Sequence, residues 1–192
     1  MKESIQQLKE EIDELLIRID ELRKQGKYDE VYVLGKRLGN RCNNIITKQA
    51  THNIAGQIAD ILNLSEQEKT TIIESADEQH ANSRGFDIRV EQPQITKNVI
   101  AEIKCFEPKS NKLNGGSHDL IKHDLDNLIK GKGNDKNKLT DTTNYYKFFG
   151  IKYTGDVEIV MQRIIKQYSP KVVLYTPDTK VSKDYIYVIY IR

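Results

Sequence analysis

The chain has 192 residues, of which 38% are hydrophobic and 30% are charged, and its formal net charge is +2. This composition is typical of a globular protein with a core, and the charge neither requires nor excludes a polyanionic partner. No apolar run approaches the length of a membrane span, and the N-terminus lacks the apolar segment of a signal peptide. Cys42 and Cys105 lie far apart in sequence, without metal-ligand spacing. We therefore expect a cytoplasmic protein with reduced cysteines and no membrane association.

The first segment has the heptad pattern of an amphipathic helix. Its apolar residues follow one another in steps of three and four, at Ile5, Leu8, Ile12, Leu15, Ile19 and Leu22. Gly26 ends this pattern, and a second helical pattern begins near Lys27 and extends to Ile45. A coiled-coil dimer and an antiparallel hairpin both fit. We favour the hairpin, because three heptads are marginal alone and a partner helix follows at once.

Two further helices are expected before the first strand. Residues 51–62 have a helical pattern, and a break precedes Ser65. Ser65 and Glu68 have the spacing of a capping box, in which each side chain bonds the other residue's main chain at a helix N-terminus. The helix that they open carries Glu74 and Glu78 on one face.

The rest of the chain alternates between strand-like and helical patterns. Strands are predicted at 84–90, 99–105, 145–151, 171–175 and 185–191, and helices at 118–130 and 157–168. This order predicts an α/β fold with a mixed central sheet flanked by helices. We expect a helical N-terminal region at 1–64 and an α/β core at 65–192.

Charged side chains interrupt two of the apolar strands. Asp87 lies in the first strand, and Glu102 and Lys104 lie in the second. Because side chains alternate along a strand, Glu102 and Lys104 share one face while Ile103 points to the other. Burial of an acid and a lysine is costly unless something compensates their charges. A bound divalent cation and a phosphate would compensate them, which indicates a nuclease.

The same residues match the needs of metal-dependent phosphodiester hydrolysis. That reaction requires a cation held by hard oxygen ligands and a positive or proton-accepting group beside the attacking water. Asp87 and Glu102 can supply carboxylates as metal ligands, and the main-chain carbonyl of Ile103 is the third expected ligand. Lys104 can supply the charge. The expected metal is Mg²⁺, with Mn²⁺ as a substitute.

This arrangement resembles the restriction-endonuclease-like superfamily with the PD-(D/E)xK signature, over roughly residues 65–176. Asp87 matches the first acid, Glu102 the second and Lys104 the lysine. Phe86 stands where a proline often precedes the aspartate. The resemblance implies a restriction-endonuclease-like core with these three residues in its active site.

The resemblance also implies an acid on the preceding helix, for which we place Glu78 slightly ahead of Glu74. It implies a DNA substrate, products with a 5′-phosphate, a homodimer for double-strand cleavage and no small-molecule cofactor. A type II restriction enzyme fits this description, and a junction resolvase or repair nuclease fits almost as well. The N-terminal helices would provide dimerisation or DNA contacts.

Other interpretations stay open. Glu102 and Lys104 could form a solvent-facing pair on an edge strand, with Asp87 at a strand start. Lys122 could contact phosphate or belong to a solvated helix face, and the lysines and aromatic residues of 130–152 could follow a phosphate backbone or form a solvated loop. A non-enzymatic helical interaction protein is the alternative from another functional class.

Overall fold

The structure is a computed structural model that describes residues 4–78, 85–91, 95–106, 115–132, 139–153 and 157–191. The chain divides into two compact units, Met1–Gln49 and Ala50–Arg192. None of the helices in the described ranges combines the length and the apolar character needed to cross a bilayer.

The first unit is a helical hairpin. Helix α1 (Ile5–Lys24) is followed by Gly26, whose φ of +72° favours glycine, and by the start of helix α2 (Tyr28–Ile61). Every seventh residue of α1 is buried, namely Leu8, Leu15 and Leu22. Arg41 of α2 reaches back to Glu11 of α1, with 2.8 Å between Nε and Oε2. The heptad pattern therefore packs within the chain, as the hairpin interpretation requires.

Helix α2 is longer than either helical segment expected from the sequence. The patterns at 27–45 and 51–62 belong to one continuous helix, since residues 46–50 contain neither proline nor glycine to end it. From Ala50 onward the helix contributes buried residues to the core of the second unit, among them Ile54, Ile58 and Ala59. The boundary between the two compact units therefore lies after Gln49, whereas the sequence predicts it after residue 64.

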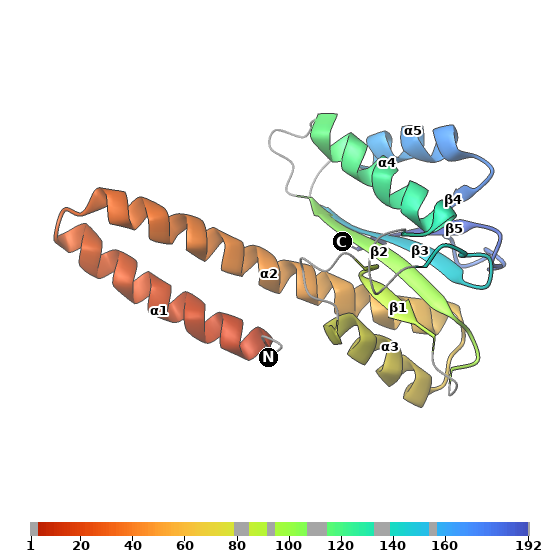
Figure 1. The fold of residues 1–192 in the computed structure, drawn as a ribbon, viewed down its shortest axis with the longest axis horizontal. Helices are drawn as coiled ribbons and strands as arrows, with labels where there is room; N and C mark the ends of the chain where they lie inside the picture. Colours follow the sequence, from red (N-terminus) through yellow and green to blue (C-terminus); the bar gives the residue numbers. More distant parts are fainter. Residues whose placement is uncertain are drawn as a thin grey trace. The chain divides into compact units, whose positions relative to one another are not determined.

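The second unit is built around a five-stranded mixed sheet (Figure 1). Its strands are β1 (Ile88–Val90), β2 (Val99–Phe106), β3 (Tyr146–Tyr153), β4 (Val172–Leu174) and β5 (Ile186–Ile191). They lie in the order β1-β2-β3-β5-β4, with β1 antiparallel to β2 and the other pairs parallel. The flanking helices are α3 (Glu66–Glu78), α4 (Gly115–Lys130) and α5 (Val157–Tyr168). The predicted α/β class with a mixed sheet and flanking helices is confirmed.

Each face of the sheet has its own hydrophobic cluster. The end of α2 and helix α3 pack with Ala101 and Ile103 of β2 on one face. Helices α4 and α5 pack with Ile100 on the other face. Figure 1 shows α3 and α4 on opposite sides of the sheet. Because side chains alternate along β2, Glu102 belongs to the face that α4 covers.

The expected capping box opens α3. Glu68 Oε2 accepts the N–H of Ser65 at 2.9 Å, and Ser65 Oγ accepts the N–H of Glu68 at 3.4 Å. The other oxygen of Glu68 accepts both the N–H and the hydroxyl of Thr96, at 2.9 and 2.8 Å. The hydrogen bonds from Thr96 and Ser65 lower the pKa of Glu68 to about 2. A helix cap thus also anchors the loop that leads into β2.

Candidate functional site

The site begins where β1 starts to pair with β2. Ile88 lies opposite Ala101, so the same register places Asp87 opposite Glu102. In place of further strand pairing, Asp87 Oδ2 accepts the N–H of Ile103 at 2.6 Å. Strand β2 continues to Phe106 beyond the pairing with β1. The Asp87 carboxylate is therefore fixed at the point where the two strands part.

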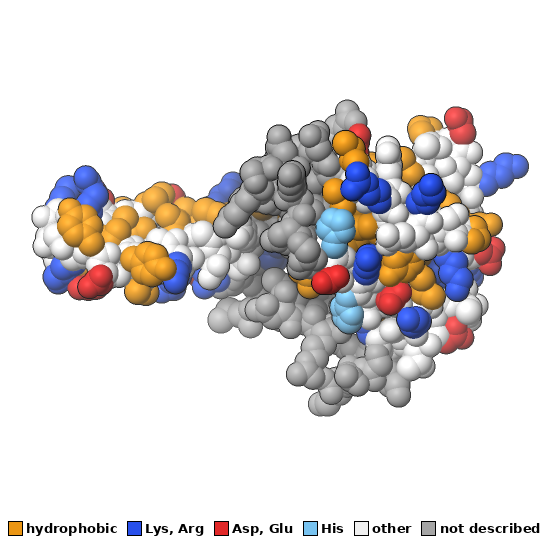
Figure 2. All heavy atoms as spheres, turned by 90° about the horizontal axis from the view of Figure 1, so that it is seen from above, with side chains coloured by type: hydrophobic (Ala, Val, Ile, Leu, Met, Phe, Trp, Pro, Cys, Tyr) orange, Lys and Arg blue, Asp and Glu red, His pale blue; other side chains and the backbone are white. Residues whose placement is uncertain are grey.

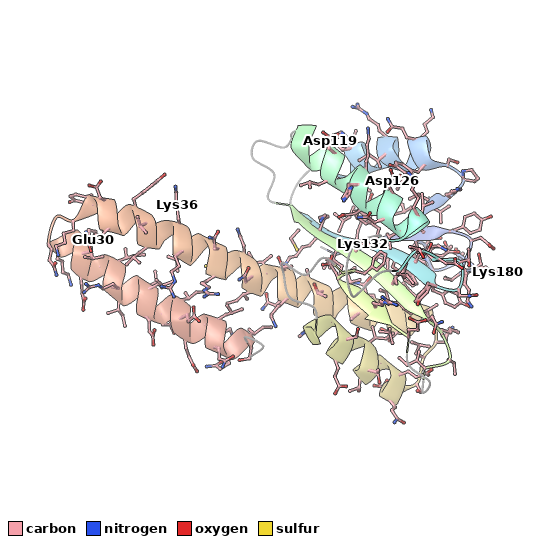
Figure 3. The ribbon with its side chains drawn as sticks, viewed as in Figure 1. Glu30, Lys36, Asp119, Asp126, Lys132 and Lys180 are labelled. Atoms are coloured by element: carbon pink, nitrogen blue, oxygen red, sulfur yellow. The ribbon has the colours of Figure 1, made fainter. Side chains whose placement is uncertain are left out.

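Glu102 is buried beside Asp87 and is paired with a lysine from a distant turn. Only 3% of the Glu102 surface is exposed, and its Oε1 forms an ion pair with Lys132 Nζ. The same ammonium donates to the carbonyl of Gly85 at 2.6 Å and lies 5.0 Å from the ring centre of Phe86. Figure 3 shows Lys132 beside the sheet, near the end of α4.

A second ion pair joins β2 to α4. Lys104 Nζ lies 2.6 Å from Asp124 Oδ2, and the two side chains are 27% and 8% exposed. Asp124 is on the inward side of α4, among the apolar residues Ile121, Leu125 and Leu128. Both pairs therefore lie on the α4 face of the sheet, in largely desolvated surroundings.

The cluster contains more negative than positive groups. Its carboxylates come from Asp87, Glu102 and Asp124, and its ammonium groups come from Lys104 and Lys132. Burial, and next the charge of Asp87, raise the pKa of Glu102 to about 8, although Lys132 acts in the opposite direction. Burial also raises the pKa of Asp87, despite the hydrogen bond from Ile103. The two acids that the sequence singled out thus lie close enough for their charges to repel.

Lys104 has the opposite electrostatic balance. Burial lowers the pKa of its ammonium, but the contact with Asp124 and the charges of Asp87 and Glu102 outweigh it. The pKa of Lys104 is consequently raised above its ordinary value. At neutral pH the group is a fixed positive charge, and it has no free electron pair with which to accept a proton.

The structure brings together three of the residues proposed from the sequence, Asp87, Glu102 and Lys104. Ile103 contributes its N–H to Asp87 and its side chain to the opposite core. Glu74 lies on α3, which packs on the other face from α4. The side chain of Glu78 lies outside the described part of the chain.

Two members of the cluster were not proposed from the sequence. Asp124 carried a detectable signal, because it follows Ile121 by three residues and precedes Leu128 by four, which places it on the apolar face of α4. Lys132 was named only as one of several lysines of 130–152 that could follow a phosphate backbone, and nothing in the sequence connects it with Glu102. It joins the site through tertiary folding alone.

The donor set fits a hard divalent cation with an incomplete protein shell. No three His, Cys, Asp or Glu side chains form a metal-binding group in the ranges that the structure describes. Mg²⁺ commonly uses one or two carboxylates and completes its shell with water and substrate oxygens. Asp87 and Glu102 supply that number of carboxylates, and with Glu102 ionised the cluster has one more negative than positive group, which favours a cation.

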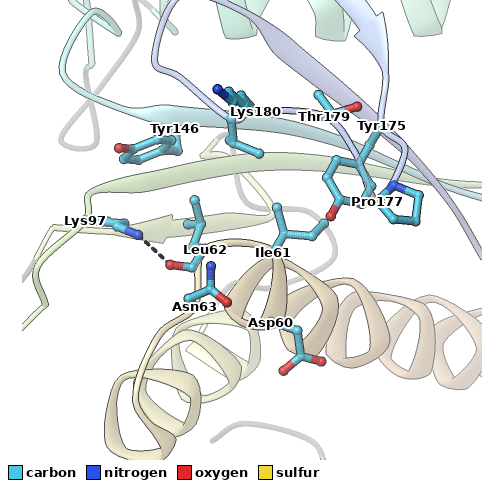
Figure 4. A pocket seen from close by; sticks show the side chains of 11 residues that line it. Asp60, Ile61, Leu62, Asn63, Lys97, Tyr146, Tyr175, Pro177, Thr179 and Lys180 are labelled. Atoms are coloured by element: carbon cyan, nitrogen blue, oxygen red, sulfur yellow. Dashed lines mark hydrogen bonds between the residues drawn. The ribbon is translucent and has the colours of Figure 1, made fainter.

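A separate pocket lies away from this cluster (Figure 4). Its lining includes Lys97, Tyr146, Tyr175 and Lys180, and Lys97 donates to the carbonyl of Leu62 at the end of α2. None of the five cluster residues lines it. Figure 2 shows the α4 and α5 side, where acidic and basic side chains are intermixed over the described surface.

No family model matches the chain, and neither a curated protein nor a solved structure is significantly similar to it.

Proposed function

We propose that this protein is a metal-dependent endonuclease that hydrolyses DNA phosphodiester bonds. The observation that carries the proposal is the buried cluster, in which Glu102, Asp87 and Lys104 lie together and burial and the charge of Asp87 raise the pKa of Glu102. Such desolvated groups of shifted pKa are concentrated at functional sites. The spacing of the three residues and the mixed sheet support a restriction-endonuclease-like core.

Each side chain has a distinct part in the proposed reaction. Asp87 and Glu102 would hold Mg²⁺, and the bound ion would supply charge neutralisation at the scissile phosphate and a lowered pKa for a water ligand. Lys104 stays protonated, so it orients the attacking water and the phosphate through charge and hydrogen bonds. The water oxygen bonds to phosphorus as its proton passes to bulk solvent, and the bond from phosphorus to the 3′ oxygen breaks as that oxygen takes a proton from solvent. The products carry a 5′-phosphate and a 3′-hydroxyl.

The decisive experiment is plasmid cleavage with Mg²⁺ or Mn²⁺ and with a chelator. The wild type should cut only with metal, while Lys104→Ala should lose cleavage by at least about 100-fold and still bind DNA. Lys166→Ala, on the exposed side of α5, is the matched control and should cut normally. Undiminished cleavage by Lys104→Ala would remove the catalytic assignment.

Double-strand cleavage needs two active sites, so we further propose a homodimer. Light scattering of the full chain, alone and with DNA, measures this directly. A type II restriction enzyme would cut a fixed duplex sequence, whereas a resolvase or repair nuclease would prefer branched or damaged substrates. A panel of these DNAs separates the subclasses.

The second candidate is a non-enzymatic partner-binding protein. The observation that favours it is the set of large apolar side chains exposed on the hairpin: Leu16, Ile17, Tyr28, Tyr32 and Val33. This function requires neither metal nor Lys104. Absence of cleavage, together with absence of heat on titration with Mg²⁺ or Mn²⁺, would favour it over the nuclease.

A further inference from the structure

The contacts of Lys132 define a cation position inside the cluster. The ammonium is held by a carboxylate oxygen of Glu102 and by the main-chain carbonyl of Gly85. Both are hard oxygen donors, the type of ligand that Mg²⁺ and Mn²⁺ prefer. Glu102 is 3% exposed, and Lys132 is its ion-pair partner among the described residues.

The main chain around Lys132 is held in place independently of this contact. Gly131 has a φ of +86°, and a Cβ there would lie 2.0 Å from the carbonyl oxygen of Leu139. The N–H of Leu139 donates to the carbonyl of Lys132 at 3.1 Å. Glycine is therefore required at this turn, which ends α4 and brings Lys132 to the sheet. The side chain beyond it is a flexible four-carbon stem that can exchange without movement of the turn.

We propose that the Lys132 ammonium is an internal counter-ion that occupies a divalent-cation position between Glu102 and the Gly85 carbonyl, and that metal binding displaces it. This inference rests on the proposed metal-dependent function and adds the Gly85 carbonyl to the ligand set. When Glu102 is ionised in the metal-free protein, Lys132 compensates its charge. The metal must compete with a tethered cation.

Competition predicts the direction of an affinity change. If Lys132 leaves the cation position free for one-tenth of the time or less, the apparent affinity of the protein for the metal falls at least about tenfold. Removal of the Lys132 charge should therefore raise metal affinity by about that factor. Replacement by arginine should lower it, because guanidinium can bind a carboxylate through two hydrogen bonds.

The test is isothermal titration of the metal-free full chain with Mn²⁺, without DNA. Lys132→Gln should bind at least about tenfold more tightly than the wild type, and Lys132→Arg should bind more weakly. Lys130→Gln is the matched control, because Lys130 is 71% exposed and pairs with Asp126; its affinity should be unchanged. Circular dichroism melts verify that each variant is folded.

A second measurement separates displacement from simple charge removal. Acylation of lysines in the wild type, followed by peptide mass spectrometry, should show faster modification of Lys132 with saturating Mn²⁺. Modification of Lys130 should stay constant. Faster modification of Lys132 supports displacement.

The outcomes distinguish this inference from the proposed function. If wild type and Lys132→Gln bind Mn²⁺ equally, or if Mn²⁺ binds without change in Lys132 modification, the displacement is wrong while metal binding stands. If only Lys132→Gln binds, the competition is supported in its strongest form. If neither binds Mn²⁺ or Mg²⁺, both proposals fail.

Discussion

Replacement of Glu102 by glutamine should stabilise the metal-free protein at neutral pH. Glu102 ordinarily titrates near 4.5, and burial together with Asp87 raises its pKa to about 8 in the folded chain. Since the folded state holds this proton more tightly than the unfolded state, ionised Glu102 opposes folding. The free energy of unfolding should therefore fall as the pH rises from about 4.5 to about 8, and then level off.

The size of this effect follows from the two pKa values. At about 1.4 kcal/mol per tenfold change, the difference between about 8 and 4.5 corresponds to roughly 5 kcal/mol at high pH and about 3 kcal/mol at pH 7. Glutamine keeps the shape and loses the charge. For a chain of this size, about 3 kcal/mol raises Tm by roughly 6 to 12 °C.

Thermal melts in chelator between pH 4 and 9 measure this difference. Glu102→Gln should melt well above the wild type at pH 8 and close to it at pH 4, while the exposed control Asp119→Asn should track the wild type. Mg²⁺ should then raise the Tm of the wild type more than that of Glu102→Gln, because a ligand stabilises the state that binds it. Equal Tm values for wild type and Glu102→Gln across this pH range in chelator would refute the reasoning.

Three further perturbations test other contacts. Glu68→Gln should lower Tm at pH 7 by weakening the bonds to Thr96 and the helix cap, and the difference should vanish as the pH falls from 4.5 to about 2. Gly131→Ala should destabilise the fold, since its Cβ would lie 2.0 Å from a carbonyl oxygen, as a denaturant titration would show. Asp124→Asn should lower the pKa of Glu102 in a carbon-13 NMR titration, because the charge of Asp124 raises it; an unchanged pKa would place Asp124 too far away to interact.

The sequence predicts the secondary structure best where local physics decides it. The apolar periodicity at 157–168 predicts α5 with the bounds that the structure has. The Ser65 and Glu68 capping box is likewise a contact between residues three apart. The continuity of α2 is harder to predict. The residues in its middle have only a weak apolar pattern, so the helical patterns on either side of them look like two separate helices.

The site was predictable only in part, for a related reason. Alternation along a strand places Glu102 and Lys104 on one face, and the antiparallel register brings Asp87 opposite Glu102. The counter-ions come from elsewhere: Asp124 from a helix and Lys132 from the turn after it. Their pairing depends on how α4 crosses the sheet, which no local pattern encodes.

Stability alone does not account for the cluster. Apolar side chains of similar volume in place of buried ion pairs are often neutral or stabilising. The neighbouring sheet positions Ile100 and Ile151 show that this face accepts such residues, since both are fully buried. A surplus carboxylate adds a further cost, which is visible in the raised pKa of Glu102. An added positive charge beside Glu102 would remove that cost, as the proposed cation would.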